Sequence, residues 1–201
     1  ELLTAGQTFF WGVTVGDGGQ RASETFETAA RPAQGSYGPL TFITHGFGDW
    51  SASLSTALGN EPFKTPEEYA ELGQLVAGGS GGGAVLHYDK TTGEWVDRET
   101  GKRGVDALKP GKSVVLLADW VKEADITDAG FSEGAADAMF ASLMQLIADT
   151  GGALGNSPFH FIGHNRGAVV NSEIVQRLGK HMPDKRVHMT TIDPFDQKQD
   201  S

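Results

Sequence analysis

The chain contains no cysteine, which excludes disulfide bonds, thiolate zinc sites and cysteine nucleophiles. No apolar run approaches the roughly 18 residues of a membrane-spanning helix, so we expect no membrane span. Basic residues are scarce: 16 Lys and Arg stand against 26 Asp and Glu, for a formal net charge of −10. Such a surface repels phosphate backbones and anionic headgroups, and we expect neither a nucleic-acid nor a membrane-surface partner.

The first residues, ELLTAGQTFFWG, lack the basic segment that opens a secretory signal peptide. We expect any leader to be absent or already removed, and the compartment stays open, with secreted or periplasmic slightly favoured over cytoplasmic. Hydrophobic residues make up 38% of the 201 residues, which is ordinary globular composition. Residues 1–201 are therefore expected to form a single domain.

Short apolar runs alternate with helical patterns along the chain. The runs lack the polar alternation of a half-exposed sheet, which predicts strands covered on both faces. These predicted strands are Leu40–Thr44, Ala84–Tyr88, Ser113–Ala118, Phe159–Ile162 and Val187–Ile192. Apolar residues at helical spacing predict helices over Ala135–Asp149 and Gly167–Gly179. The order indicates an α/β fold with a mainly parallel sheet flanked by helices.

Two glycine-containing segments need separate interpretations. Turn residues between Leu86–Tyr88 and Glu94–Val96 predict a hairpin. The segment VAGGSGGGAV, Val76–Val85, predicts a flexible loop. Its G-x-G-x-x-A match at Gly79–Ala84 leads into a strand instead of following one, so we expect no nucleotide site there.

The five residues Gly163–Gly167, with the sequence GHNRG, lie between a predicted strand and a predicted helix. This is the context of a nucleophile elbow, in which the central residue has a positive φ and projects its side chain above the sheet. The central residue here is Asn165. Asparagine tolerates a positive φ, but an amide has no hydroxyl to deprotonate and is not a competent acyl-transfer nucleophile.

Two further segments have the chain order of a hydrolase site. His45-Gly46-Phe47-Gly48 follows a predicted strand, as does the loop that supplies an oxyanion-hole N–H; the donors would be the backbone N–H groups of Phe47 and Arg166. Asp193 ends the last predicted strand, where the acid of a Ser-Asp-His series stands. Each segment alone also fits an ordinary turn at a strand end.

Together these segments resemble the α/β-hydrolase superfamily, especially its lipase and esterase branch. The lipase G-H-S-x-G region, with its serine exchanged, is similar to FHFIGHNRGAVVNSEIVQRL. The lipase oxyanion loop is similar to HGF, and the lipase segment that holds the triad acid is similar to TTIDP. The strand end that precedes the long helix in that branch is similar to LLADWVKEADI. Residues of about 84–112 look like a hairpin insertion.

The resemblance implies ester hydrolysis through an acyl-enzyme, a small-molecule or lipid ester substrate, and no cofactor or metal. It places Asn165 at the nucleophile position and Asp193 as the acid. The other implied site residues are Phe47 and Arg166 as oxyanion donors and His45, Gly46 and His164 in substrate binding.

The pattern breaks at two triad positions, because Asn165 replaces the serine and no histidine follows Asp193. Three accounts stay open: a longer, C-terminally truncated hydrolase with an inactivating change, a binding or scaffold module that keeps the fold, or an Asn165-derived aspartate acting as nucleophile. We expect negligible esterase turnover by this chain. If Ser201 is the true end of the chain, the strand Val187–Ile192 would be an open edge, and we would expect a further segment, a partner or a second copy to cover it.

Acidic residues near the end of the chain offer one alternative site. Asp193, Asp196 and Asp200 present oxygens that calcium accepts, but their spacing is irregular and lacks the glycine and glutamate of an EF-hand. A solvated acidic segment is the better interpretation, and no metal site is expected.

Overall fold

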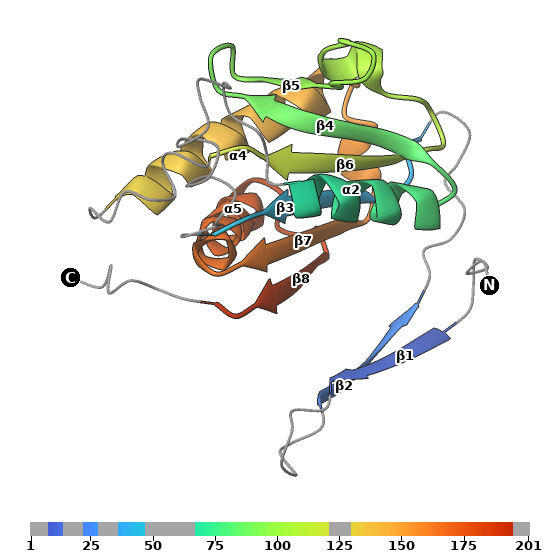
Figure 1. Ribbon diagram of the computed structural model, residues 1–201, viewed down its shortest axis with the longest axis vertical. Coiled ribbons are helices and arrows are strands. Elements are labelled where there is room, and N and C mark those ends of the chain that lie inside the picture. Colours follow the sequence, from blue (N-terminus) through green and yellow to red (C-terminus); the bar gives the residue numbers. More distant parts are fainter. Residues whose placement is uncertain (1–7, 14–21, 28–35, 47–66, 121–129, 195–201) are drawn as a thin grey trace.

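The structure of the chain is a computed structural model that describes residues 8–13, 22–27, 36–46, 67–120 and 130–194. A six-stranded sheet with the order β5-β4-β6-β3-β7-β8 forms its centre (Figure 1). The strands are β3 (Leu40–Thr44), β4 (Gly83–Asp89), β5 (Glu94–Val96), β6 (Ser113–Ala118), β7 (Phe159–His164) and β8 (Val187–Ile192). All neighbouring strands pair in parallel except β4 and β5. The predicted α/β fold with a mostly parallel sheet is confirmed.

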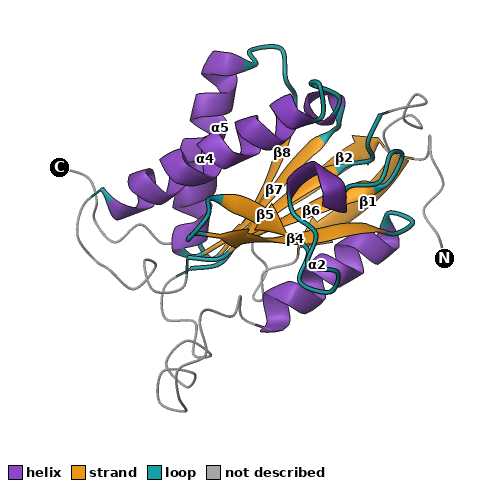
Figure 2. Ribbon diagram, turned by 90° about the horizontal axis from the view of Figure 1, so that it is seen from above, coloured by secondary structure: helices purple, strands orange, loops and turns teal. Residues whose placement is uncertain are grey.

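Helices cover both faces of this sheet. The helices α4 (Phe131–Asp149) and α5 (Arg166–His181) lie on one face, and α2 (Glu67–Gly79) lies on the other (Figure 2). No helix among the described residues is long and apolar enough to cross a membrane. Two 3-10 turns, η1 (Gly104–Ala107) and η2 (Leu154–Asn156), complete the connections.

The central strands β3 and β6 are buried along their whole length because apolar side chains leave the sheet in both directions. Leu40 and Phe42 pack with the residues under α4 and α5, whereas Ile43 packs with those under α2. The Phe42 ring stacks on Phe161 at a centroid distance of 5.4 Å. This burial on two faces is the reason that these runs show no polar alternation.

The predicted hairpin is present as β4 and β5. His87 pairs with Val96, and the turn between the strands includes Gly93 at a φ of 72°. The strand β4 also pairs in parallel with β6, so the stretch that resembles an insertion contributes a strand to the main sheet. Its placement brings the polar residues at the end of β4 to the carboxyl edge of that sheet.

The predicted glycine loop is largely wrong, because Val76–Gly79 form the last turn of α2. Sequence reasoning missed this helix because glycine interrupts its apolar stripe. Gly73 faces the sheet closely: a Cβ there would lie 3.1 Å from a Leu117 methyl group and 3.2 Å from one of Val85. Only residues 80–82 separate α2 from β4.

The prediction that every strand is covered on both faces is wrong for β8. This strand pairs with β7 alone among the described strands, and its residues are half-buried or exposed, with Ile192 46% exposed. Two further strands, β1 (Thr8–Val13) and β2 (Ala22–Glu27), pair antiparallel and were not predicted. The segment 196–200, which holds two of the three aspartates considered for calcium, lies outside the described residues.

Candidate functional site

Asn165 occupies the single-residue turn between β7 and α5, as the elbow pattern predicts. Its φ is 51° and its ψ is −125°. The positive φ agrees with the prediction, while the ψ lies outside the left-handed helical region that the elbow pattern predicts. Asn165 is half-buried at the carboxyl edge of the sheet. In open α/β sheets this edge is where ligands bind.

Glycines make this turn sterically possible. A Cβ on Gly163 would lie 2.6 Å from the Cα of Ala168, and a Cβ on Gly167 would lie 2.2 Å from the carbonyl oxygen of Thr44. Both distances are far shorter than a van der Waals contact. The helix α5 therefore begins in direct contact with the ends of β7 and β3, as the glycine spacing indicated.

The loop after β3 lies against the elbow, although the two are far apart in the chain. A Cβ on Gly46 would be 2.3 Å from the Cβ of Asn165 and 3.0 Å from the backbone nitrogen of Arg166. The fold therefore brings together two of the three segments on which the resemblance depends. Phe47, the other predicted oxyanion donor, lies outside the described residues.

The backbone N–H of Arg166 is engaged by the side chain before it. It donates to the Oδ1 atom of Asn165 at 2.8 Å. In a serine-containing elbow this N–H points to the oxyanion. Here the carboxamide oxygen takes that hydrogen bond, so Asn165 both lacks a hydroxyl and occupies the predicted donor.

Asp193 follows the strand that hydrogen-bonds to the elbow. The N–H of Asn165 donates to the carbonyl oxygen of Ile192 at 2.9 Å, which places the backbone of Asp193 one residue from that contact. Asp193 is exposed and has a φ of 44°. All three segments of the predicted site thus meet at one edge of the sheet, while the roles assigned to their residues stay predictions.

The side chain of Arg166 points into the protein and is 1% exposed. Its guanidinium lies 5.7 Å from the ring centroid of Trp120 and donates to the hydroxyl of Ser132 at 3.2 Å. Arginine is suited to this position because a planar guanidinium stacks on aromatic faces and is weakly hydrated. The elbow is in this way joined to the end of β6 and the first turn of α4.

His45 and His164, the predicted binding histidines, contact other residues of the fold. His45 is buried, and its carbonyl oxygen accepts from the indole N–H of Trp120 at 2.9 Å. The Nδ1 atom of His164 lies 2.8 Å from the hydroxyl of Tyr69 in α2. The binding roles of these two histidines stay predictions.

The other four histidines lie in several parts of the fold. His160 and His188 stack on each other across β7 and β8 at 4.5 Å, and His181 packs against Phe140. His87 lines a separate cavity. That none of the six histidines acts as the base stays a prediction.

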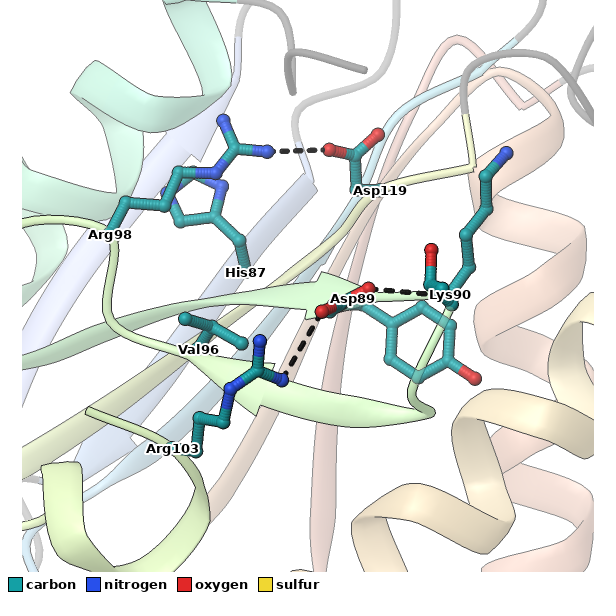
Figure 3. A pocket seen from close by; sticks show the side chains of 9 residues that line it. His87, Asp89, Lys90, Val96, Arg98, Arg103 and Asp119 are labelled. Carbon is teal, nitrogen blue, oxygen red and sulfur yellow. Dashed lines mark hydrogen bonds and ion pairs between the residues drawn. The ribbon is translucent and has the colours of Figure 1, made fainter. Parts of the chain in front are cut away.

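A polar cavity of about 220 Å³ lies beside this site, between the β4–β5 hairpin and the end of β6. Arg98 donates to the buried carboxylate of Asp119 at 2.9 Å, and Arg103 pairs with Asp89 at 3.2 Å (Figure 3). Burial and the charge of Arg98 lower the pKa of His87 from 6.5 to about 4, so its imidazole is neutral at pH 7. The cavity lining carries three cations, Lys90, Arg98 and Arg103, and two carboxylates, Asp89 and Asp119.

Sequence reasoning missed the residues that support the elbow. The Asp-Trp pair at the end of a predicted buried strand drew attention to Trp120. The neighbouring residues did not indicate that Trp120 would contact His45 and Arg166. Tyr69 and Ser132 had no local signal, because their partners are distant in sequence. In the part of the chain that the structure describes, no group of three His, Asp or Glu side chains is placed to hold a metal ion.

Comparison with known proteins finds no protein-family model, no curated protein and no solved structure that matches this chain. The function must therefore be inferred from the site.

Proposed function

We propose that this chain is a lipase- or esterase-like hydrolase scaffold whose ester-cleaving step is disabled by Asn165. The observation that carries this proposal is the Asn165 turn itself, a non-glycine residue with a φ of 51° and a ψ of −125° between a parallel strand and a helix. Such strained backbone is retained where the surrounding structure enforces it, commonly at functional sites. The contact with Gly46 and the adjacent end of β8 support the same assignment.

The chemistry follows from what each group offers. A hydroxyl at position 165 would attack an ester carbonyl, and the Arg166 N–H would stabilise the oxyanion that forms. The asparagine carboxamide supplies no such hydroxyl and accepts the N–H that the oxyanion needs. Turnover by the chain as written is therefore expected to be negligible.

A substitution that restores the nucleophile tests the proposal. Asn165→Ser provides a hydroxyl and releases the Arg166 N–H, and added imidazole supplies a base in solution. We expect Asn165→Ser with imidazole to hydrolyse short-chain nitrophenyl esters at least about ten-fold faster than Asn165→Ala at the same imidazole concentration, since only the serine variant has a hydroxyl that a base can activate as nucleophile. The alanine variant is the matched control, because it frees the same N–H without adding a nucleophile.

The competing function is a binding module that keeps the fold and the cleft without catalysis. The hydrogen bond between Asn165 and Arg166 favours this alternative, because it satisfies the oxyanion donor internally. If folded Asn165→Ser is no faster than Asn165→Ala at any imidazole concentration, the hydrolase proposal is rejected. Saturable binding of an ester by the unaltered chain would then support the module.

A further inference from the structure

The backbone torsion of Asn165 brings its side chain next to the nitrogen of the following residue. Its ψ is −125°. Around the Cα–C bond of an L-residue, the Cβ atom and the next backbone nitrogen eclipse each other when ψ is about −120°. Helices and strands have ψ values of about −40° and about +135°, far from this eclipse. Asn165 therefore has a backbone arrangement in which its Cγ and the Arg166 nitrogen can close a five-membered ring.

The contact that such a ring requires is already present. The Arg166 nitrogen lies 2.8 Å from the Oδ1 atom of Asn165, to which its N–H donates. A C=O bond is about 1.2 Å long, so this nitrogen is at most about 4 Å from Cγ. Rotation about the Cα–Cβ bond moves Cγ toward the nitrogen, and reacting atoms in a near-attack arrangement are about 3–3.5 Å apart.

Hydrogen bonds on both sides of Asn165 hold this torsion in place. The N–H of Asn165 donates to the carbonyl oxygen of Ile192 at 2.9 Å, and its carbonyl oxygen accepts from the N–H of Ala168 at 3.1 Å. The loop after β3 closes the remaining side, since a Cβ on Gly46 would lie 2.3 Å from the Asn165 Cβ. An unfolded chain favours the strand, polyproline and helical ranges of ψ, so folding raises the population of the reactive torsion.

The helix that begins at Arg166 favours negative charge at this point. Arg166 is the first residue of α5, so its N–H is one of the helix-terminal donors that no intrahelical hydrogen bond uses. The positive end of the helix dipole stabilises charge that develops on this nitrogen and on Oδ1 during ring closure. A carboxylate at the same N-cap position is stabilised as well. Asn165 is only half-buried, so water has access to it.

We propose that Asn165 is a site of self-modification, at which the Arg166 nitrogen closes a succinimide ring and hydrolysis then leaves a carboxylate. The inference goes beyond the proposed function and does not rest on it, because it requires only the geometry of the turn. The product is also chemically different from the starting residue, since a carboxylate can act as a nucleophile and a carboxamide cannot.

The reaction has two steps and consumes one water molecule. In the first, hydroxide or a buffer base removes the proton of the Arg166 N–H, the nitrogen forms a bond to Cγ, and the bond between Cγ and Nδ2 breaks. The Nδ2 group takes up a proton and leaves as ammonia. In the second, water adds to one of the two ring carbonyls and cleaves its bond to the nitrogen. Addition at Cγ gives aspartate, and addition at the backbone carbonyl gives isoaspartate.

Two other asparagines among the described residues are internal controls. Asn156 ends η2 and Asn171 lies within α5, so both belong to helical segments. Each is followed by a serine, which hinders ring closure less than the larger arginine that follows Asn165. In the unfolded chain, Asn156 and Asn171 should therefore react before Asn165. In the folded chain we expect the reverse order.

The experiment incubates the unaltered chain at mildly alkaline pH in water enriched in heavy oxygen, and peptide mass spectrometry reads each asparagine. Every converted residue acquires one heavy oxygen atom. We expect residue 165 to convert at least about ten-fold faster in the folded chain than in the chain unfolded by guanidinium chloride at the same pH, because the fold holds the reacting atoms together. Asn156 and Asn171 should stay unconverted in the folded chain over the same time.

Asn165→Gln is the matched variant, because it keeps the carboxamide but lengthens the side chain by one methylene. Ring closure would then need a six-membered ring and the eclipsed torsion no longer suits it, so residue 165 should acquire no heavy oxygen in the same time. If this variant does not fold, the comparison of the folded and unfolded unaltered chain decides alone. Hydroxylamine tests the intermediate, since it opens a succinimide to a hydroxamate at residue 165.

Three results would overturn the inference. These are conversion of Asn165 no faster in the folded than in the unfolded chain, conversion of Asn156 or Asn171 before Asn165 in the folded chain, and conversion of Asn165 with no intermediate that hydroxylamine traps. None of them bears on the esterase assay of Asn165→Ser, which has no asparagine at this position. The two proposals therefore fail separately.

Discussion

Replacing Gly46 by alanine is the most direct test of the contact between the loop after β3 and the elbow. Gly46 is buried and does not have a positive φ, so glycine is required there for space and not for backbone conformation. The added Cβ would lie 2.3 Å from the Cβ of Asn165 and 2.6 Å from the carbonyl oxygen of His164. The nearest atoms belong to the backbone or to a Cβ, so no side-chain rotation relieves the overlap.

The magnitude follows from how little the elbow can move. An ordinary carbon–carbon contact is about 3.5–4 Å, so the overlap with Asn165 exceeds 1 Å. Gly163 and Gly167 already hold the elbow against Ala168 and Thr44. Overpacking of this kind costs about 1–3 kcal/mol, and we expect a loss of about 2 kcal/mol in the free energy of unfolding. For a chain of this size that corresponds to a fall of about 4–8 °C in Tm.

Urea unfolding followed by circular dichroism measures this loss, with a thermal scan as the second reading. Gly179→Ala is the control, because the same methyl group there meets no atom within 4 Å, and its helical position favours alanine by up to about 1 kcal/mol. If Gly46→Ala unfolds within about 0.5 kcal/mol of the unaltered chain, the loop does not press on the elbow. The oxyanion assignment would then lose its geometric basis.

Two further predictions concern buried polar groups. Burial and the neighbouring His188 lower the pKa of His160 from 6.5 to about 4. The imidazole of His160 therefore binds its proton at a higher pH in the unfolded chain than in the folded chain. Its contribution to the free energy of unfolding is complete above pH 6.5 and declines as the pH falls to about 4. Urea titrations across this range should show a shallower decline in His160→Asn but not in His181→Gln, and equal slopes would contradict the assignment. Thr44→Val removes the buried 2.6 Å hydrogen bond to Asn171 and should lower the free energy of unfolding by about 1–3 kcal/mol. The double variant Thr44→Val/Asn171→Leu should lose less free energy of unfolding than the sum of the losses in the two single variants, and a double-mutant cycle measures this difference.

Much of the fold was predictable because its signals are local. The runs Leu40–Thr44 and Ser113–Ala118 became β3 and β6 without a change in their ends, since apolar residues in succession have few alternatives to a buried strand. The turn residues before Glu94 fixed the hairpin. Helix α2 escaped prediction because Gly73 and the glycines at its end lower helix propensity, and packing against Val85 and Leu117 compensates for that loss.

The candidate site was predictable in part for a similar reason. The glycines two residues before and two residues after Asn165 indicate a tight turn, and this signal depends on neighbouring residues alone. The burial of Arg166 was not predictable, because a charged residue becomes stable in the interior only when partners such as Trp120 and Ser132 are brought to it. Nor did the sequence indicate that the Asn165 carboxamide would accept the Arg166 N–H.

By itself the sequence determined the strands of the six-stranded sheet, the hairpin and the residue at the apex of the elbow, since each depends on neighbours within a few positions. Only the tertiary structure decided that Gly46 abuts Asn165, that Ile192 hydrogen-bonds to it and that β8 is half exposed. These features depend on the strand order β6-β3-β7-β8, which joins segments up to about 150 residues apart. Contacts across such separations are set by the packing of the whole sheet, and no short stretch of residues encodes them.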